Sequence, residues 1–349
     1  MSGIKTWLEK AVNASWYGRI PWTYALKPLE YLSHHHISKR RRLRKSPQKG
    51  PIIVVVGNIT VGGTGKTPIL ISLAKSLHKA GLRVGIVARG YGGSNDRYPL
   101  QVTENTSVTQ CGDEAKLLAM ATGCDVWVDP KRRRALEALL SNSSVDVVLS
   151  DDGLQHYELE RDIEVCVIDG QRGFGNQQCL PTGPLREPLD RLSDVDFIVI
   201  NGNQGAVDNF KERYSVESYL NNRDLHCATI QPNTFIALKS GDSIPLKEFP
   251  RLKTYSAVTG IGNPQRFFDT LSSLSISYNE HIFPDHYRYQ KKDFATLHSP
   301  ILMTEKDAVK CLGFAEEDWF YLNVYASFST PFFDHLVTKI QALQSSRGR

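Results

Sequence analysis

Short apolar runs alternate with amphipathic segments through the middle of the chain. Residues 51–58, PIIVVVGN, are apolar and rich in β-branched side chains, which is typical of a strand buried on both faces of a parallel sheet. Residues 66–80 then place apolar side chains at helical spacing, with Pro68 in the first turn and Gly81 just after the end. The pattern predicts a buried strand that leads directly into a helix.

The same alternation continues for more than a hundred residues. It predicts strands at 83–90, 124–129, 145–150, 163–169 and 196–200, with helices at 112–122 and 130–141. Strands and helices that alternate at this spacing form βαβ units, so we predict an α/β fold with a mostly parallel sheet covered by helices.

A polar, Asn-rich stretch at 203–225 is the predicted domain boundary. It separates a core domain from a smaller second α/β domain, and an amphipathic pattern near 330–343 predicts a terminal helix. The predicted divisions are 1–49, 50–215, 225–330 and 331–349.

The N-terminal segment differs from the rest of the chain in charge. Residues 1–49 carry eleven Lys and Arg against two Glu, a balance of +9, whereas the whole chain carries +5. Residues 4–16 predict an amphipathic helix with an aromatic and aliphatic face, and 39–45 read KRRRLRK. Two interpretations stand: a helix that docks on an anionic membrane surface, or a helix packed on the protein beside a solvated basic loop. No nucleic-acid-binding module accompanies the basic run.

Composition excludes several classes of protein. A chain of 349 residues exceeds the usual size of one core, and 41% hydrophobic with 23% charged residues is ordinary for a folded globular protein. The six cysteines form no CxxC pair, so we expect reduced thiols. No uncharged apolar run approaches the roughly 18 residues that a spanning helix needs.

The segment TVGGTGKT, residues 60–67, matches a phosphate-binding loop except at its opening glycine, which is Thr60. It follows the first buried strand and begins a helix, as such a loop requires. Its amides would surround the phosphates, Lys66 would reach the outer phosphates, and the hydroxyl of Thr67 would bind Mg²⁺. The predicted ATP-binding residues are Thr60, Val61, Gly62, Gly63, Thr64, Gly65, Lys66 and Thr67.

Carboxylates follow other predicted strands. Asp151 and Asp152 come directly after the strand at 145–150, where they would hold Mg²⁺ or cap a helix. A kinase also needs a group that accepts the proton of the attacking hydroxyl. Asp113 and Asp285, the latter beside His286, are both candidates, and local pattern does not choose between them.

Two glycine-rich loops also follow strands, at the sheet edge where α/β proteins bind ligands. They are RGYGG at 89–93 and the long loop at 169–189, which carries Arg172 and Arg186. A loop of this length in a compact domain usually has a binding role, and Arg suits a phosphate or carboxylate.

Taken in order, these motifs resemble the tetraacyldisaccharide 4'-kinases of lipid A biosynthesis. The motifs are VGNITVGGTGKTP, RGYGG, GDEA, SDDGLQH, IDGQRGFGN, LPTGPLREP, TGIGNPQRFF, FPDHY and TEKDAVK. The resemblance implies an ATP- and Mg²⁺-dependent kinase that phosphorylates the 4'-hydroxyl of a tetraacylated glucosamine disaccharide 1-phosphate. It also implies a peripheral position on the cytoplasmic face of the bacterial inner membrane, reached through the N-terminal segment.

The resemblance assigns roles to individual positions, and Thr60 fits the family's own loop. Asp113 would engage the acceptor hydroxyl with help from His286, and closure of two domains would bring these residues together. The implied catalytic residues are Asp113, His286, Lys66 and Asp152. The implied metal ligands are Thr67, Asp151, Asp152 and Glu187. The implied substrate-binding residues are Tyr91, Asn176, Arg186 and His156.

A rival interpretation is a membrane-surface P-loop ATPase that uses nucleotide as a switch. Such proteins often carry a second Lys early in the loop, where this chain has Val61. The expected partners are therefore ATP, the acylated disaccharide and the membrane surface, with no nucleic acid and no obligate protein partner.

Overall fold

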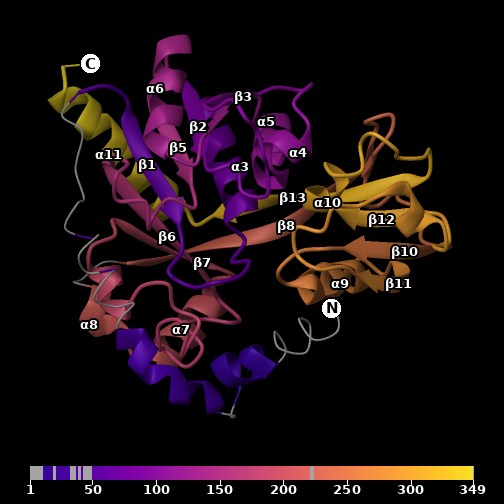
Figure 1. The fold of residues 1–349 in the computed structure, drawn as a ribbon, viewed down its shortest axis with the longest axis horizontal. Helices are drawn as coiled ribbons and strands as arrows, with labels where there is room; N and C mark the ends of the chain where they lie inside the picture. Colours follow the sequence, from indigo (N-terminus) through magenta and orange to yellow (C-terminus); the bar gives the residue numbers. More distant parts are fainter. Residues whose placement is uncertain are drawn as a thin grey trace. The chain divides into compact units, whose positions relative to one another are not determined.

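The chain divides into two compact units, each assembled from several segments of sequence. Figure 1 labels the helices and strands and colours them by their position along the sequence. The computed structural model describes residues 11–18, 21–31, 37, 41, 49–220 and 224–348. Unit 1 comprises 1–66, 146–229 and 328–349. Unit 2 comprises 67–145 and 230–327.

Unit 1 is built around a parallel sheet. Its strands lie in the order β5, β1, β6, β7 and the first part of β8. Their bounds are β1 Ile52–Gly57, β5 Val147–Asp151, β6 Ile163–Asp169, β7 Phe197–Asn201 and β8 Leu225–Ala237. Every residue of β1, β5, β6 and β7 is buried, because helices and loops cover both faces of these β-branched strands.

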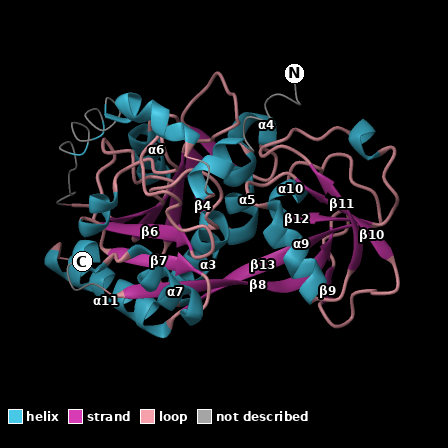
Figure 2. Ribbon diagram, turned by 90° about the horizontal axis from the view of Figure 1, so that it is seen from below, coloured by secondary structure: helices cyan, strands magenta, loops and turns pink. Residues whose placement is uncertain are grey.

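Short and long helices accompany this sheet, and Figure 2 draws α7 and α11 beside β6 and β7. The bounds are η1 Trp22–Leu26, η2 Leu189–Ser193, α7 Gln204–Tyr214, α8 Glu217–Leu220 and α11 Thr330–Ser346. Helix α7 lies within the stretch that the sequence marked as a polar boundary. It forms because Val207, Phe210 and Tyr214 recur at helical spacing and are buried.

Unit 2 contains two groups of strands. In the first, β2 pairs with β4 in parallel and β3 pairs with β4 antiparallel. These elements and their helices are α3 Lys66–Lys79, β2 Val84–Ala88, β3 Leu100–Val102, α4 Val108–Cys111, α5 Asp113–Thr122, β4 Asp125–Val128 and α6 Arg132–Asn142.

The second group runs β11, β10, β12 and β13 in parallel, and β9 pairs antiparallel with β8. The bounds are β9 Ser243–Pro245, β10 Thr254–Thr259, α9 Pro264–Ser273, β11 Ser277–Ile282, η3 Lys291–Phe294, β12 Ile301–Thr304, α10 Glu305–Ala308 and β13 Trp319–Phe328. Phe235, Phe249, Phe268 and their neighbours form a buried aromatic core here.

The predicted fold class is confirmed: the chain has an α/β fold in which most strand pairs are parallel. The divisions predicted at 50–215 and 225–330 stay predictions. Much of the predicted helix at 4–16 and of the basic run at 39–45 lies outside the described residues, although 11–17 are helical. Within the described ranges, no helix has the length and apolar content needed to cross a membrane.

The described part of the N-terminal segment is anchored to the long loop of unit 1. The backbone N–H of Asn176 donates to the carbonyl of Trp16 at 2.8 Å, and the indole of Trp16 donates to the carbonyl of Pro181 at 3.3 Å. The hydroxyl of Thr23 donates to the carbonyl of Thr182 at 2.7 Å. The helical turn at Trp16 and the segment at Thr23 therefore pack on the long loop.

A buried ionic network fixes the loop that follows β5. Glu164, fully buried on β6, accepts from Arg161 at 3.0 Å and from Arg191 at 2.6 Å. Arg191 also donates to the hydroxyl of Tyr157 at 3.1 Å, and Tyr157 donates to Glu187. Because both guanidinium groups are themselves buried, Glu164 supplies the negative charge on which they depend.

We expect Glu164→Ala to destabilise the protein by about 3–5 kcal/mol, since it leaves two buried guanidinium groups without their shared carboxylate. The matched control is Glu137→Ala, which removes an exposed pair with Arg133 and should cost under about 1 kcal/mol. Urea unfolding followed by circular dichroism measures both. Equal losses in the two variants would contradict the proposed importance of Glu164.

Candidate active site

The phosphate loop of unit 1 lies between β1 and the start of α3. Gly62 and Gly65 have φ angles of +96° and +81°, a region that glycine adopts at little cost. Thr60 is buried and forms a β-bridge with Leu185, and the N–H of Val61 donates to the carbonyl of Pro184 at 2.8 Å. The residue that replaces the expected glycine thus pairs with the long loop.

Lys66 and the end of β5 come together as the sequence predicted for a phosphate site. The ammonium of Lys66 lies 3.5 Å from a carboxylate oxygen of Asp152 and 3.2 Å from the side-chain oxygen of Asn58. Asp152 also accepts from Arg186 at 2.9 and 3.0 Å. A nucleotide phosphate near Lys66 would therefore meet two cations whose charge Asp152 only partly balances.

Asp151 ends β5 opposite Val56 of β1, and it is buried. Thr67 follows Lys66 in the first turn of α3. These residues carry the oxygen ligands that Mg²⁺ prefers. Among the described residues, no three His, Cys, Asp or Glu side chains gather to hold a metal by themselves. Mg²⁺ in kinases needs few protein ligands, because phosphates and water supply the others.

Three other predicted site residues are engaged within unit 1. Glu187 is fully buried, with one oxygen bound by Tyr157 and the other by the amide of Gln155 at 2.7 Å. The side chain of Asn176 donates to Thr182 and accepts from the N–H of Gln178. His156 is half-buried, and its carbonyl accepts from Arg161. Their predicted roles toward metal and substrate stay predictions.

Unit 2 holds a second group of charged side chains around Asp113. Asp113 is the first residue of α5 and is buried. Nδ1 of His286 lies 3.1 and 2.9 Å from its two carboxylate oxygens. The sequence divisions assigned these residues to different domains, whereas both belong to unit 2 and are already in contact.

The backbone conformation at Gly112 and at His286 sets the directions of the Asp113 and His286 side chains. Gly112, with φ +85°, joins α4 to α5, and a side chain at this position would collide with the carbonyl of Tyr91. His286 itself has φ +58°. The ring of Tyr91 packs edge-on against His286 with centroids 4.9 Å apart, and Arg288 donates to the carbonyl of Gly92 at 2.8 Å. The 89–93 loop therefore supports the imidazole.

Lys306 completes the cluster and was not among the predicted site residues. Its ammonium lies 3.0 Å from Glu114, 3.5 Å from Asp285 and 3.9 Å from Asp113. The sequence signal was the TEKD motif, in which Thr304 caps α10 and so fixes where Lys306 points. The pairing with α5 joins residues almost two hundred positions apart, which local pattern does not reveal.

The pKa values of this cluster favour an ionised pair. Burial alone would raise the pKa of Asp113, but the hydrogen bond with His286 and the charge of Lys306 outweigh it and lower that pKa below its usual value. The hydrogen bond to Asp113 raises the pKa of His286, against burial and the charge of Lys306. Burial would lower the pKa of Lys306, but the three neighbouring carboxylates raise it.

Comparisons with known proteins agree on one family. The family described as Tetraacyldisaccharide-1-P 4'-kinase matches residues 22–341. A tetraacyldisaccharide 4'-kinase of Alcanivorax borkumensis is 42% identical, covering 97% of this chain and 98% of that protein. One of Stutzerimonas stutzeri is 44% identical over 93% of this chain and 95% of the relative.

A solved structure extends the likeness to three dimensions. It is the LpxK of Aquifex aeolicus, described as an "apo" form in complex with ATP. It superposes with a TM-score of 0.73 at 26% identity and covers 92% of this chain and 99% of its own. From the family match and the near full-length relatives, the chain belongs to the tetraacyldisaccharide-1-P 4'-kinase family.

Proposed function

We propose that this protein transfers the γ-phosphoryl group of ATP to the 4'-hydroxyl of a tetraacylated glucosamine disaccharide 1-phosphate. The observation that carries the proposal is the contact of 2.9 Å between His286 and the buried carboxylate of Asp113. A nucleotide switch needs no hydrogen-bonded carboxylate other than those that serve its phosphate loop. A kinase with an alcohol acceptor needs one to orient the hydroxyl and take its proton.

In this proposal the phosphate loop binds ATP. Lys66 and the amides of residues 60–67 hold the phosphates, and Arg186 adds positive charge beside Asp152. Thr67, Asp151 and Asp152 would hold Mg²⁺, which when bound neutralises charge on the phosphates. Glu187 stays a predicted ligand, with its oxygens turned to Tyr157 and Gln155.

In this proposal Asp113 and His286 act on the hydroxyl group of the acceptor. The oxygen of the hydroxyl forms the new bond to the γ-phosphorus, the bond to the bridging oxygen of ADP breaks, and the hydroxyl proton passes to the Asp113–His286 pair. A carboxylate with a lowered pKa is ionised at neutral pH and accepts a hydrogen bond from the hydroxyl. The same carboxylate orients the hydroxyl oxygen toward the γ-phosphorus, and positioning of this kind supplies much of the catalysis of phosphoryl transfer.

The decisive experiment follows the lipid product. Purified protein, labelled ATP and the acylated disaccharide 1-phosphate in detergent should yield a lipid with two phosphates. Asp113→Ala should lower this turnover by about 10²–10⁴-fold, with the affinity for ATP nearly unchanged. Asp269→Ala, an exposed carboxylate on α9, is the matched control. ATP consumption without a phosphorylated lipid would instead favour the nucleotide switch.

The pair should also make stability depend on pH in a defined direction. Because the folded pKa of His286 is raised above its ordinary value of 6.5, its stabilising charge is fully present below pH 6.5 and is lost as pH rises through the folded pKa. His286→Gln should therefore lower the melting temperature more at pH 5.5 than at pH 9. His78→Gln, an exposed imidazole on α3, is the control, and a loss independent of pH would refute the assignment.

The basic N-terminal segment would bring the protein to its lipid substrate at the cytoplasmic face of the inner membrane. Arg41 is already paired with Asp190 at 3.0 Å and with Asp194, so it is left intact in the test. Replacing Arg40, Arg42, Arg44 and Lys45 by Gln should weaken binding to anionic vesicles by about 1 kcal/mol for each charge removed. Binding to neutral vesicles is the reference, and an unchanged affinity for anionic vesicles would exclude this docking role.

A further inference from the structure

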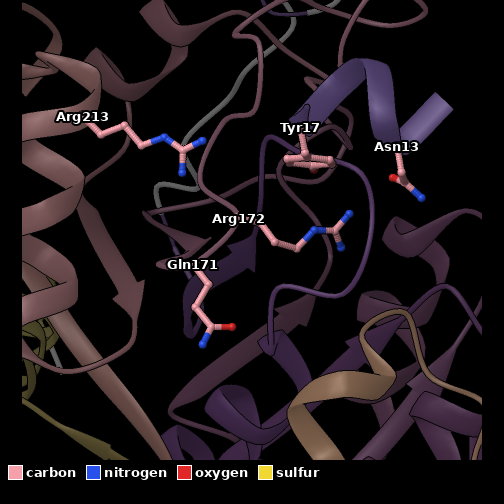
Figure 3. A pocket seen from close by; sticks show the side chains of 5 residues that line it. All are labelled: Asn13, Tyr17, Gln171, Arg172 and Arg213. Carbon is pink, nitrogen blue, oxygen red and sulfur yellow. The ribbon is translucent and has the colours of Figure 1, made fainter. Parts of the chain in front are cut away.

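Lys306 of unit 2 has different surroundings from two arginines of unit 1. Arg172 and Arg213 line a cavity of about 340 Å³ (Figure 3), and Arg172 lies over the ring of Tyr17 at 4.5 Å. Lys306 instead faces three carboxylates, and only 16% of its side chain is exposed. A long cation that is mostly withdrawn from water loses hydration and rotamer freedom, so its neighbours must compensate for that loss. The reaction proposed above nevertheless gives Lys306 no part.

The backbone that carries Lys306 is fixed by contacts that do not involve its own side chain. The hydroxyl of Thr304 accepts from the N–H of Asp307 at 3.2 Å and donates to the carboxylate of Asp307 at 2.6 Å. Asp307 is fully buried and also accepts from the N–H of Gly260 at 3.0 Å and from the hydroxyl of Tyr289 at 3.2 Å. The short helix α10 therefore has a defined place, from which the ammonium reaches α5.

The ammonium of Lys306 hydrogen-bonds two of its three carboxylates. Nζ donates to Glu114 at 3.0 Å and to Asp285 at 3.5 Å. Its distance from Asp113 is 3.9 Å, which is too long for a hydrogen bond. The oxygens of Asp113 instead contact Nδ1 of His286 at 2.9 and 3.1 Å. Lys306 therefore supplies positive charge to Asp113 without occupying the oxygens that an acceptor hydroxyl would approach.

Lys306 and His286 face the same two carboxylates. Nε2 of His286 lies 3.9 Å from Asp285, while its Nδ1 contacts Asp113. Lys306 likewise lies near both Asp285 and Asp113. Cation and carboxylate thus alternate around a closed path of four side chains. Removing the ammonium would leave His286 as the cation that both carboxylates share.

The charge of Lys306 acts in the same direction on both members of the pair. For Asp113, burial raises the pKa, whereas the hydrogen bond with His286 and then the charge of Lys306 lower it. For His286, the hydrogen bond to Asp113 raises the pKa, whereas burial and the charge of Lys306 lower it. Lys306 therefore weakens the hold of the pair on a proton, whichever member carries that proton. A pair that held its proton tightly would already be protonated when the hydroxyl arrived.

The other charged and titratable groups near the pair have different partners or weaker effects. Lys310 acts on the pair more weakly than Lys306 does, and its ammonium lies 2.7 Å from a different carboxylate. Lys116 on α5 donates to two backbone carbonyls, and Arg288 donates to a carbonyl of the 89–93 loop. Burial raises the pKa of the Cys111 thiol to about 11, so this group is neutral at physiological pH. Lys306 is therefore the cation that chiefly adjusts the pair.

We propose that Lys306 is a positioning residue for phosphoryl transfer, whose ammonium balances the carboxylates around Asp113 and so keeps Asp113 ionised and bound to His286 when the acceptor arrives. The inference rests on the proposed function. Lys306 neither gives nor takes a proton in the reaction. It acts through the Asp113–His286 pair, which accepts the hydroxyl proton.

The first test measures how kcat/KM for the lipid depends on pH, because this profile reports the ionisation of the free enzyme. Lys306→Met should move the acidic limb to higher pH by about one unit or more, since the loss of a facing cation stabilises the protonated pair. Activity should fall about tenfold on the acidic side and recover as pH rises. Lys306→Arg keeps the charge and should leave the limb in place. Lys291→Met, which removes an exposed pair with Glu316, is the matched control.

Two results of this test would overturn the proposal. The first is an acidic limb that Lys306→Met leaves in place. The second is a loss of activity that is equal at every pH, which would give Lys306 a structural role only. Melting temperatures of the variants at each pH ensure that the profiles are those of folded protein.

Asp285 allows the sign of the effect to be tested. Asp285→Asn removes a carboxylate that both cations face, so it should move the acidic limb to lower pH. Combined with Lys306→Met, it should return the limb toward its position in the unmodified protein. A limb that stays displaced in the double variant would attribute the effect to lost packing and refute the electrostatic role. Because the side chain of Asp285 is 38% exposed, the single variant tests the proposal even if Lys306→Met does not fold.

A titration without substrates separates this inference from the proposed activity. The imidazole C–H resonance of His286, assigned by its loss in His286→Gln, should titrate at higher pH in Lys306→Met and be unchanged in Lys291→Met. A displaced midpoint in a protein that phosphorylates no lipid would disprove the proposed function but not the effect of Lys306 on the pair. An unchanged midpoint in an active kinase would disprove this inference alone.

Discussion

Two main-chain hydrogen bonds join the chain at the start of the phosphate loop to the long loop at 169–189. Val61 donates to Pro184 at 2.8 Å, and Arg186 donates to Ile59 at 2.7 Å, so the segment leaving β1 pairs with the long loop after β6. This pairing brings Arg186 to Asp152 and Lys66. The same long loop carries the contacts to Trp16 and Thr23. The candidate nucleotide site and the described part of the N-terminal segment thus both contact the long loop at 169–189.

The charged cluster of unit 2 follows a different principle, because its members stabilise one another's ionised forms. Asp113 is buried, yet His286 and Lys306 keep its pKa low. Lys306 in turn is surrounded by three carboxylates that raise its own pKa. The pKa values of Asp113, His286 and Lys306 therefore depend on one another, and the three groups are coupled.

Features set by neighbouring residues were predictable from the sequence, and features set by distant pairs were not. The run at 163–169 predicts β6 to the residue, since its apolar, β-branched side chains leave a fully buried strand as the favoured structure. The phosphate loop and the Asp113–His286 pair were also anticipated, the latter through family resemblance. Helix α7 was missed because charged and amide side chains obscure its three buried positions. Lys306 was missed as a site residue because only the fold brings it to Glu114, which lies far away in the sequence.

The left-handed backbone of His286 marks a place where the protein has not been selected for maximal stability. A non-glycine residue at φ +58° costs on the order of 1 kcal/mol, which glycine would avoid. Glycine would also remove the imidazole that supports Asp113. The protein therefore keeps the strained conformation. The hydrogen bond from Arg288 to the carbonyl of Gly92 offsets part of its cost. Engineering this chain for thermostability should leave position 286 alone, because a substitution that relieves the backbone there would also remove the contact with Asp113.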